Sequence, residues 1–396
     1  MSRKTAFVGF SYMAGLLLAS FFSAPLSIAI GAVLLGFGLC TVFIFRPKHS
    51  GSFYRSAVCA IACCVGLWIY SGYDMTVCRN ITANIGNFSG TVTIEQSTVY
   101  SEEKAFYIAH CTFPNGASGN VGFFDRRSDL VKGDKITLSG QLYAPENTGF
   151  FNSADYYRSM NVFLLMKSVR TSGYEIKEHN FYRTLDDFRH NVSDTIRKYV
   201  PSEEGELLIG MIFGSSKWNM SDRTENLLYR AGIGHVAAVS GLHMSVAAGI
   251  AAALAIALRL PKWGQFISVT AVSLLFAMTA GFTPSVVRSL IMVMFVWAAG
   301  IFNRRSDSLT SLAAAIIIMT ISSPFIVRST SFLLSVSGTI GTAVLSPMFI
   351  NAYEKKMERK TDLPYHVGAL TSALCSSLCA AAAVSPVSAL TFDQIS

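Results

Sequence analysis

The feature that most constrains this fold is the recurrence of long, uninterrupted apolar segments along its 396 residues. A helix needs about 20 such residues to cross the hydrocarbon core of a bilayer. The chain has nine segments of this kind, at residues 5–24, 26–45, 54–72, 236–258, 264–282, 284–302, 308–327, 331–350 and 367–390. Only 14% of its residues are charged, against about a quarter in soluble globular domains. The sequence therefore predicts a polytopic α-helical membrane protein.

A long polar stretch lies between the third and fourth apolar segments and sets the domain organisation. Such a stretch cannot enter a bilayer, so it forms a separate domain inserted after the third transmembrane helix. We expect four parts: three N-terminal transmembrane helices at 1–72, an inserted domain at 73–180, an amphipathic helical segment at 181–232 and a domain of about six transmembrane helices at 233–396. The amphipathic segment either lies on the outer membrane surface or docks on the bundle.

Lysine and arginine residues in the short loops predict the orientation, because such residues concentrate on the cytoplasmic side. Five basic clusters occur: Arg3 with Lys4; Arg46, Lys48 and Arg55; Arg259 with Lys262; Arg304 with Arg305; and Lys355, Lys356, Arg359 and Lys360. Threading the helices from a cytoplasmic N-terminus places all five clusters on the cytoplasmic side. We therefore expect a multi-pass protein whose inserted domain lies outside the cytoplasm.

The inserted domain has the pattern of a small all-β domain. Five stretches rich in β-branched and aromatic residues predict strands, at 90–98, 104–112, 119–125, 134–143 and 161–169. Five short strands with long connections favour a barrel of the OB type. We therefore expect an extracytoplasmic all-β OB-like domain.

This domain holds weak candidates for contact with nucleic acid. Exposed aromatic rings can stack on bases, and basic side chains bind phosphates. The candidates are Phe123, Phe124, Arg126, Arg127, Lys132 and Lys135. The alternatives are that the aromatic residues belong to the barrel core and that the basic residues form a solvated face. Between Gly72 and Asn180 there are 10 basic and 11 acidic residues, so overall charge does not favour nucleic acid.

The inserted domain contains two cysteines, Cys78 and Cys111. A domain outside the cytoplasm meets oxidising conditions, in which disulfides persist. We therefore expect a Cys78–Cys111 disulfide, with two free, buried thiols as the alternative.

The apolar segments contain no aspartate or glutamate, although carriers driven by protons or cations normally keep an acid there. Arg288 does lie inside one of them, in Ala280-Gly-Phe-Thr-Pro-Ser-Val-Val-Arg288. Thr283 followed by Pro284 predicts a helix start, and Gly281 predicts a break before it. A guanidinium near a helix N-terminus forms an anion site. The alternative is an Arg288 side chain that extends to the outer membrane interface.

Polar and small residues also mark the start of the fourth apolar segment: His235 directly precedes it, and Ser240, Gly241 and His243 lie within it. The two histidines are eight residues apart with no third ligand nearby, which excludes a zinc site of usual spacing. No acid is present to orient a histidine for hydrolysis. We expect these residues to face a pore, the alternative being helix packing through small residues. The sequence thus predicts no catalytic residue, metal or cofactor.

Two of these motifs resemble those of the ComEC family of competence proteins, which are inner-membrane channels for DNA uptake in bacteria. Ala231-Gly-Ile-Gly-His-Val-Ala-Ala-Val-Ser-Gly-Leu-His243 is similar to the family's GLxHLLAVSGLH signature, and residues 280–288 are similar to AGFxPSxxR. In the inserted domain, residues 132–140 and 149–158 resemble the family's extracytoplasmic OB-like domain. The resemblance implies a path for single-stranded DNA past His235, Ser240, Gly241, His243, Gly281, Pro284 and Arg288.

The same resemblance implies a location and partners. The chain would lie in the bacterial cytoplasmic membrane and work with a DNA receptor and a cytoplasmic translocation ATPase or helicase, surrounded by membrane lipid. Many family members also carry a metallo-β-lactamase-like domain, which needs an HxHxDH-type cluster. None of the seven histidines here lies in such a pattern, so we expect a short form without nuclease activity, and no enzyme.

Other functions remain open from the sequence. The first is a transporter or flippase for another anionic substrate, which would act without DNA. The second is a receptor whose inserted domain alone carries the function. The third is an inactive, truncated family member. A homo-oligomer and the energy source also stay open.

Overall fold

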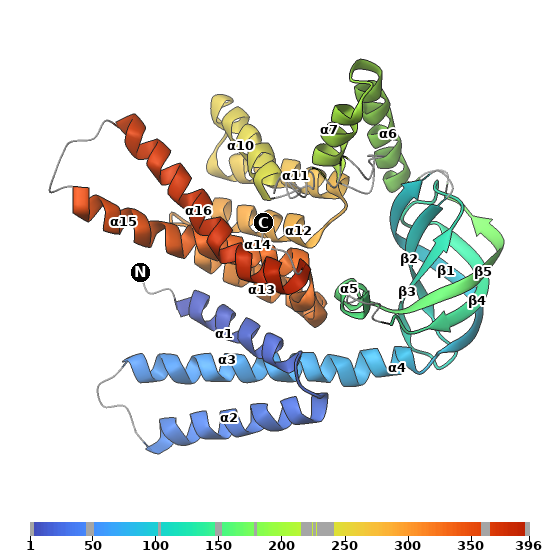
Figure 1. The fold of residues 1–396 in the computed structure, drawn as a ribbon, viewed down its shortest axis with the longest axis horizontal. Coiled ribbons are helices and arrows are strands. Elements are labelled where there is room, and N and C mark those ends of the chain that lie inside the picture. Colours follow the sequence, from blue (N-terminus) through green and yellow to red (C-terminus); the bar gives the residue numbers. More distant parts are fainter. Residues whose placement is uncertain are drawn as a thin grey trace.

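A computed structural model describes residues 4–44, 51–101, 104–146, 153–177, 180–214, 224, 227, 241–357 and 365–392. Figure 1 shows a bundle of helices with a β-barrel at one end, and the N-terminus at the opposite end. Within the described residues, five helices are long and apolar enough to cross a membrane: Arg55–Thr82, Lys262–Ala280, Pro284–Ile301, Thr330–Ala352 and Leu370–Leu390. Four shorter apolar helices accompany them: Thr5–Ala19, Ala24–Gly36, Gly241–Ala257 and Ser308–Ser322. Each predicted apolar segment thus corresponds to one apolar helix.

The N-terminal helices are α1 (Lys4–Ala19), α2 (Ala24–Ile44) and α3 (Gly51–Tyr73). Helix α1 packs so closely on α3 that a Cβ atom on Gly66 would lie 2.3 Å from the carbonyl oxygen of Tyr12. Helix α3 continues through a π-turn, η1 (Asp74–Cys78), and helix α4 (Arg79–Thr82). The predicted domain boundary between residues 72 and 73 therefore lies inside one helix. The backbone hydrogen bonds of this helix continue past the point where the side chains become polar.

The barrel consists of β1 (Gly86–Ser101), β2 (Lys104–Thr112), β3 (Ser118–Asp125), β4 (Lys135–Tyr143) and β5 (Val162–Glu175). It is closed in the order β1-β2-β3-β5-β4. The β3–β5 pair is parallel and the other pairs are antiparallel. A parallel pair needs a crossover connection, and helix α5 (Ser153–Ser159) lies in the connection that precedes β5. The five-stranded barrel predicted from the sequence is confirmed.

The barrel and the bundle share one apolar core. The ring of Phe325, in the 3₁₀ turn η3 (Pro324–Arg328), packs edge-on against Tyr70 and Tyr73 of α3 and against Phe163 of β5. An ion pair of 2.6 Å joins Arg328 to Asp155 of α5. The barrel is therefore packed against the helices rather than tethered to them by a linker.

The remaining helices lie beyond the barrel in sequence. Helices α6 (Phe181–Tyr199) and α7 (Glu203–Phe213) form the amphipathic segment. The bundle continues with α10 (Gly241–Ala257), α11 (Lys262–Ala280), α12 (Pro284–Ile301), α13 (Ser308–Ser322), α14 (Thr330–Ile340), a π-turn η4 (Gly341–Leu345), α15 (Ser346–Met357) and α16 (Tyr365–Phe392). Helix α13 ends earlier than the predicted 308–327 segment because Pro324 starts the 3₁₀ turn.

Candidate functional site

Arg288 lies one turn inside α12, a helix that packs against α10, α11, α13 and α14. The residue is only 8% exposed. Its Nε donates to Ser335 Oγ at 2.7 Å, and its Nη1 donates to Thr339 Oγ1 at 2.9 Å and to Met292 Sδ at 3.0 Å. The side chain thus crosses to α14 instead of reaching for the membrane interface. The alternative of an interfacial arginine is therefore wrong.

All of these acceptors are neutral, and this gives the site its electrostatic character. Within the described residues, Arg288 makes no ion pair with a carboxylate. Burial of a charge is costly unless another charge or several hydrogen bonds compensate it. Hydroxyl and thioether dipoles hold the guanidinium here without cancelling its charge. The arrangement can attract an anion.

The start of α10 lies directly against this guanidinium. A Cβ atom on Gly241 would lie 3.2 Å from Arg288 Nη2 and 2.7 Å from Ser289 Oγ. A side chain at position 241 would displace Ser289 Oγ or the guanidinium, so the structure brings the predicted Gly241 and Arg288 together. His243, one turn into α10, is half-buried. The predicted His235 and Ser240 lie outside the described residues.

The connection from α11 to α12 produces the predicted break. Gly281 adopts a left-handed conformation with φ of 85° and caps α11, as the C-terminal end of a helix commonly requires. Pro284 is the first residue of α12, and Thr283 is its N-cap residue. The Thr283 hydroxyl makes no capping hydrogen bond, which differs from the role we expected of it.

Sequence reasoning missed the polar partners on α14 and α12. Ser335 and Thr339 are four residues apart, so they share one face of α14. Ser285 Oγ lies 3.2 Å from Ser335 Oγ, and Ser289 Oγ donates to the Ser285 carbonyl. The sequence did contain one signal for these partners: Ser335 and Thr339 are hydroxyl residues four positions apart in an apolar segment.

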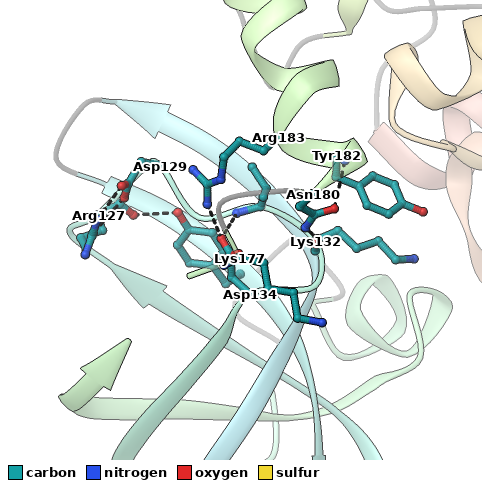
Figure 2. Close-up of polar contacts among 10 residues, drawn as sticks. Arg127, Asp129, Lys132, Asp134, Lys177, Asn180, Tyr182 and Arg183 are labelled. Carbon is teal, nitrogen blue, oxygen red and sulfur yellow. Dashed lines mark hydrogen bonds and ion pairs between the residues drawn. The ribbon is translucent and has the colours of Figure 1, made fainter. Parts of the chain in front are cut away.

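The basic cluster predicted on the barrel is largely balanced by acids. Figure 2 shows Lys132 beside Asn180 at the start of α6, and Arg127 paired with Asp129 away from that helix. Arg127 Nε donates to Asp129 at 2.8 Å, Lys132 lies 3.7 Å from Glu95, and Lys135 lies 3.5 Å from Glu175. Asp129 is two residues from Arg127, whereas Glu95 and Glu175 approach Lys132 and Lys135 only in the folded barrel. The interpretation as a basic surface is therefore corrected. Arg126 is exposed.

The two predicted stacking residues point in opposite directions. Phe123 is 1% exposed and packs on Tyr107 inside the barrel. Phe124 is 46% exposed and packs on Phe106 with ring centroids 5.1 Å apart. Successive residues of a strand face opposite sides of a sheet, so only Phe124 is accessible to a base. The prediction for Phe123 is wrong.

The predicted Cys78–Cys111 disulfide is not formed in this structure. Both residues are free and buried, and both belong to the core that the barrel shares with the bundle. The alternative of two buried thiols describes this arrangement. Burial raises the pKa of the Cys111 thiol to about 12.

We expect Cys111 to react slowly with maleimide at pH 8 in the folded chain and fully after denaturation, because the thiolate is the reactive form. Because the pKa of this thiol is higher in the folded chain than in the unfolded chain, its contribution to the free energy of unfolding is fully present below about pH 8.5 and is lost as pH rises towards 12. Mass spectrometry of the labelled peptides measures both the rate and the free thiol count. Rapid labelling of Cys111 at pH 8, or a disulfide-linked peptide, would contradict this prediction.

A comparison with known protein families matches the helical region of the chain. Residues 211–396 match the family model described as Competence protein. No curated protein and no solved structure matches the chain. The matched residues include α10, α12 and α14, which together build the Arg288 site. Over residues 211–396, the chain is therefore similar to the competence protein family.

Proposed function

We propose that this protein is a channel that passes single-stranded DNA inward across the bacterial cytoplasmic membrane during natural transformation. The observation that carries the proposal is Arg288, a buried guanidinium held by neutral groups where α10, α12 and α14 meet. Similarity to the competence protein family supports DNA as the anion. No nuclease activity is part of the proposal.

The chemistry of Arg288 suits a phosphodiester backbone. A guanidinium binds phosphate oxygens through a planar pair of donors, and the N-terminal ends of α10 and α12 add partial positive charge. Phosphates carry no sequence information, so passage is insensitive to base sequence and weakens with salt. A single cationic site binds the DNA weakly enough to release it, so the DNA strand can continue through the channel.

We infer that the barrel is of the OB type and receives the strand outside the cytoplasm. Its five strands, closed in the order β1-β2-β3-β5-β4, support this inference. The face formed by β2 and β3 carries Phe106 and the exposed Phe124, which suits stacking on bases. Lys262 at the start of α11 bonds to Asn303 after α12, so these basic loops lie at the other end of the bundle. That arrangement supports a cytoplasmic location for the loops.

In this proposal the driving force comes from partners: a receptor outside the cell and an ATPase or helicase in the cytoplasm. The chain itself supplies the path through the lipid bilayer. Association of copies of the chain is compatible with this path.

Transport in a defined system tests the proposal. Full-length protein in liposomes of phosphatidylethanolamine and phosphatidylglycerol should admit a fluorescent single-stranded oligonucleotide down its gradient, measured as protection from external nuclease. We expect equal rates for oligonucleotides of different sequence and lower rates at higher salt. Liposomes that admit a small anionic dye but no oligonucleotide would support a transporter of another anion and contradict the proposal.

A further inference from the structure

Helix α6 runs from the barrel to the bundle and makes side-chain hydrogen bonds to both. At its start, Arg183 Nη2 donates to Asp134 Oδ2 at 2.8 Å, and Asn180 Nδ2 donates to the Lys132 carbonyl at 2.6 Å (Figure 2). The Asp134 side chain is fully buried. The same carboxylate accepts from the backbone N–H groups of Val131 and Lys177. The first turn of α6 is therefore fixed to the barrel by several hydrogen bonds.

Six residues further along, Arg189 fixes α6 to the end of α11. Its Nη2 donates to the carbonyl of Met278 at 2.6 Å and to that of Thr279. Asp186, at 3.6 Å on the same helix, pairs with its Nη1. The last four carbonyls of a helix have no partner within the helix. Arg189 supplies that partner, and its charge matches the negative end of the α11 dipole.

The carbonyls that Arg189 holds lie immediately before the break that orients Arg288. The backbone N–H groups of Gly281 and Phe282 both donate to the Ala277 carbonyl, so the chain reverses within the last turn of α11. Helix α12 then begins at Pro284. Because this connection is short, a shift of the α11 end moves the first turns of α12 and with them the guanidinium.

We propose that Arg189 is a positioning residue for DNA passage: it fixes the break between α11 and α12, and thereby sets Arg288 relative to the barrel through α6. This inference rests on the proposed function. In this arrangement α6 connects the two parts of the protein: Arg183 binds the barrel, and Arg189 binds the end of α11 next to the channel site. If the barrel moves when it binds single-stranded DNA, α6 would transmit that movement to the first turns of α12 and so shift Arg288.

The experiment compares variants of Arg189 in competent cells with a matched variant on the same helix. Arg189→Met removes the charge and the donors, and Arg189→Lys keeps an ammonium that can donate to both carbonyls. Lys198→Met removes an exposed charge near the C-terminal end of the same helix, where Lys198 lies over the Tyr199 ring. We expect Arg189→Met to lower DNA entry into the cytoplasm about tenfold, as loss of a charge-assisted hydrogen bond would. We expect Arg189→Lys to restore most of it and Lys198→Met to have no effect. Protein level and DNA binding at the cell surface should stay constant.

A double variant separates positioning from general damage. If Arg189 acts through Arg288, the double variant Arg189→Met with Arg288→Ala should be no worse than Arg288→Ala alone. Arg189→Gln, which keeps a neutral donor, replaces Arg189→Met if the latter fails to accumulate. Normal uptake by the accumulating Arg189 variant, with uptake lost in Arg288→Ala, overturns the positioning role alone. Normal uptake by Arg288→Ala overturns the proposed function itself.

Discussion

Replacing Arg288 with alanine is expected to reduce DNA entry into the cytoplasm about 10- to 100-fold, the range that corresponds to losing a hydrogen bond to a charged group. The reason is the position of the guanidinium, which lies against Gly241 of α10 and donates to Ser335 of α14. The measurement is the amount of labelled DNA that resists external nuclease in competent cells, normalised to protein level. DNA entry in the Arg288→Lys variant should lie between that of the wild type and that of Arg288→Ala, because an ammonium keeps the charge but not the planar pair of donors.

The control for this experiment is Arg305→Ala, which removes an exposed arginine from the loop after α12. We expect that variant to take up DNA normally. Alanine at 288 also leaves the Ser335 and Thr339 hydroxyls without their donor, but it relieves the cost of burying a charge. Its effect on stability should therefore be small, within about 2 kcal/mol. Uptake by Arg288→Ala at the wild-type rate, with normal protein level, would contradict the channel site.

The second large effect is expected at Asp134. Replacing this carboxylate with alanine should lower the free energy of unfolding of the barrel by about 3–5 kcal/mol, because it leaves the Arg183 charge and the backbone N–H groups of Val131 and Lys177 without their acceptor. The loss should also release α6 from the barrel, since Arg183 belongs to that helix. Thermal unfolding of the full chain in detergent, together with limited proteolysis of α6, measures the effect.

Asp129 provides a matched control on the segment that leads from β3 to β4. It forms a bidentate pair with Arg127, and its side chain is 53% exposed. The hydrogen bonds from Arg127 lower the pKa of Asp129, so the pair contributes stability above the usual aspartate pKa and loses it as pH falls through the lowered value. An exposed pair of this kind contributes about 1 kcal/mol or less. Equal losses for Asp129→Ala and Asp134→Ala would contradict the structural role assigned to Asp134.

The strands were predictable because their pattern is local. Every predicted strand corresponds to a strand of the barrel, and the predicted ranges differ mainly in β1 and β5, which extend further. The order of the strands could not be read in the same way, since it depends on which edges meet when the sheet closes. Phe123 and Phe124 illustrate the difference: the sequence shows that they face opposite sides, but only the closed barrel decides which side is the core.

The candidate site was predictable to a similar degree. Arg288, Gly281 and Gly241 stand out because charge, a helix start and small residues are unusual in apolar segments. Their partners on α14 and the contact from Arg189 were not predictable, because hydroxyls four residues apart are common and arginines on an amphipathic helix usually face water. The basic cluster at Arg127, Lys132 and Lys135 was misjudged for the same reason: Glu95 and Glu175 approach it only in the folded barrel.

By itself, the sequence determined that this protein is built from apolar helices with one polar, all-β insertion, because burying apolar surface and satisfying backbone hydrogen bonds are demands on each segment separately. Tertiary structure alone decided that the barrel is packed on the bundle through Phe325 and the Arg328–Asp155 pair. It also decided that Arg288 is buried against hydroxyl groups and that α6 joins the barrel to the break before it. These features depend on contacts between residues that are distant in sequence, and no local pattern encodes such contacts.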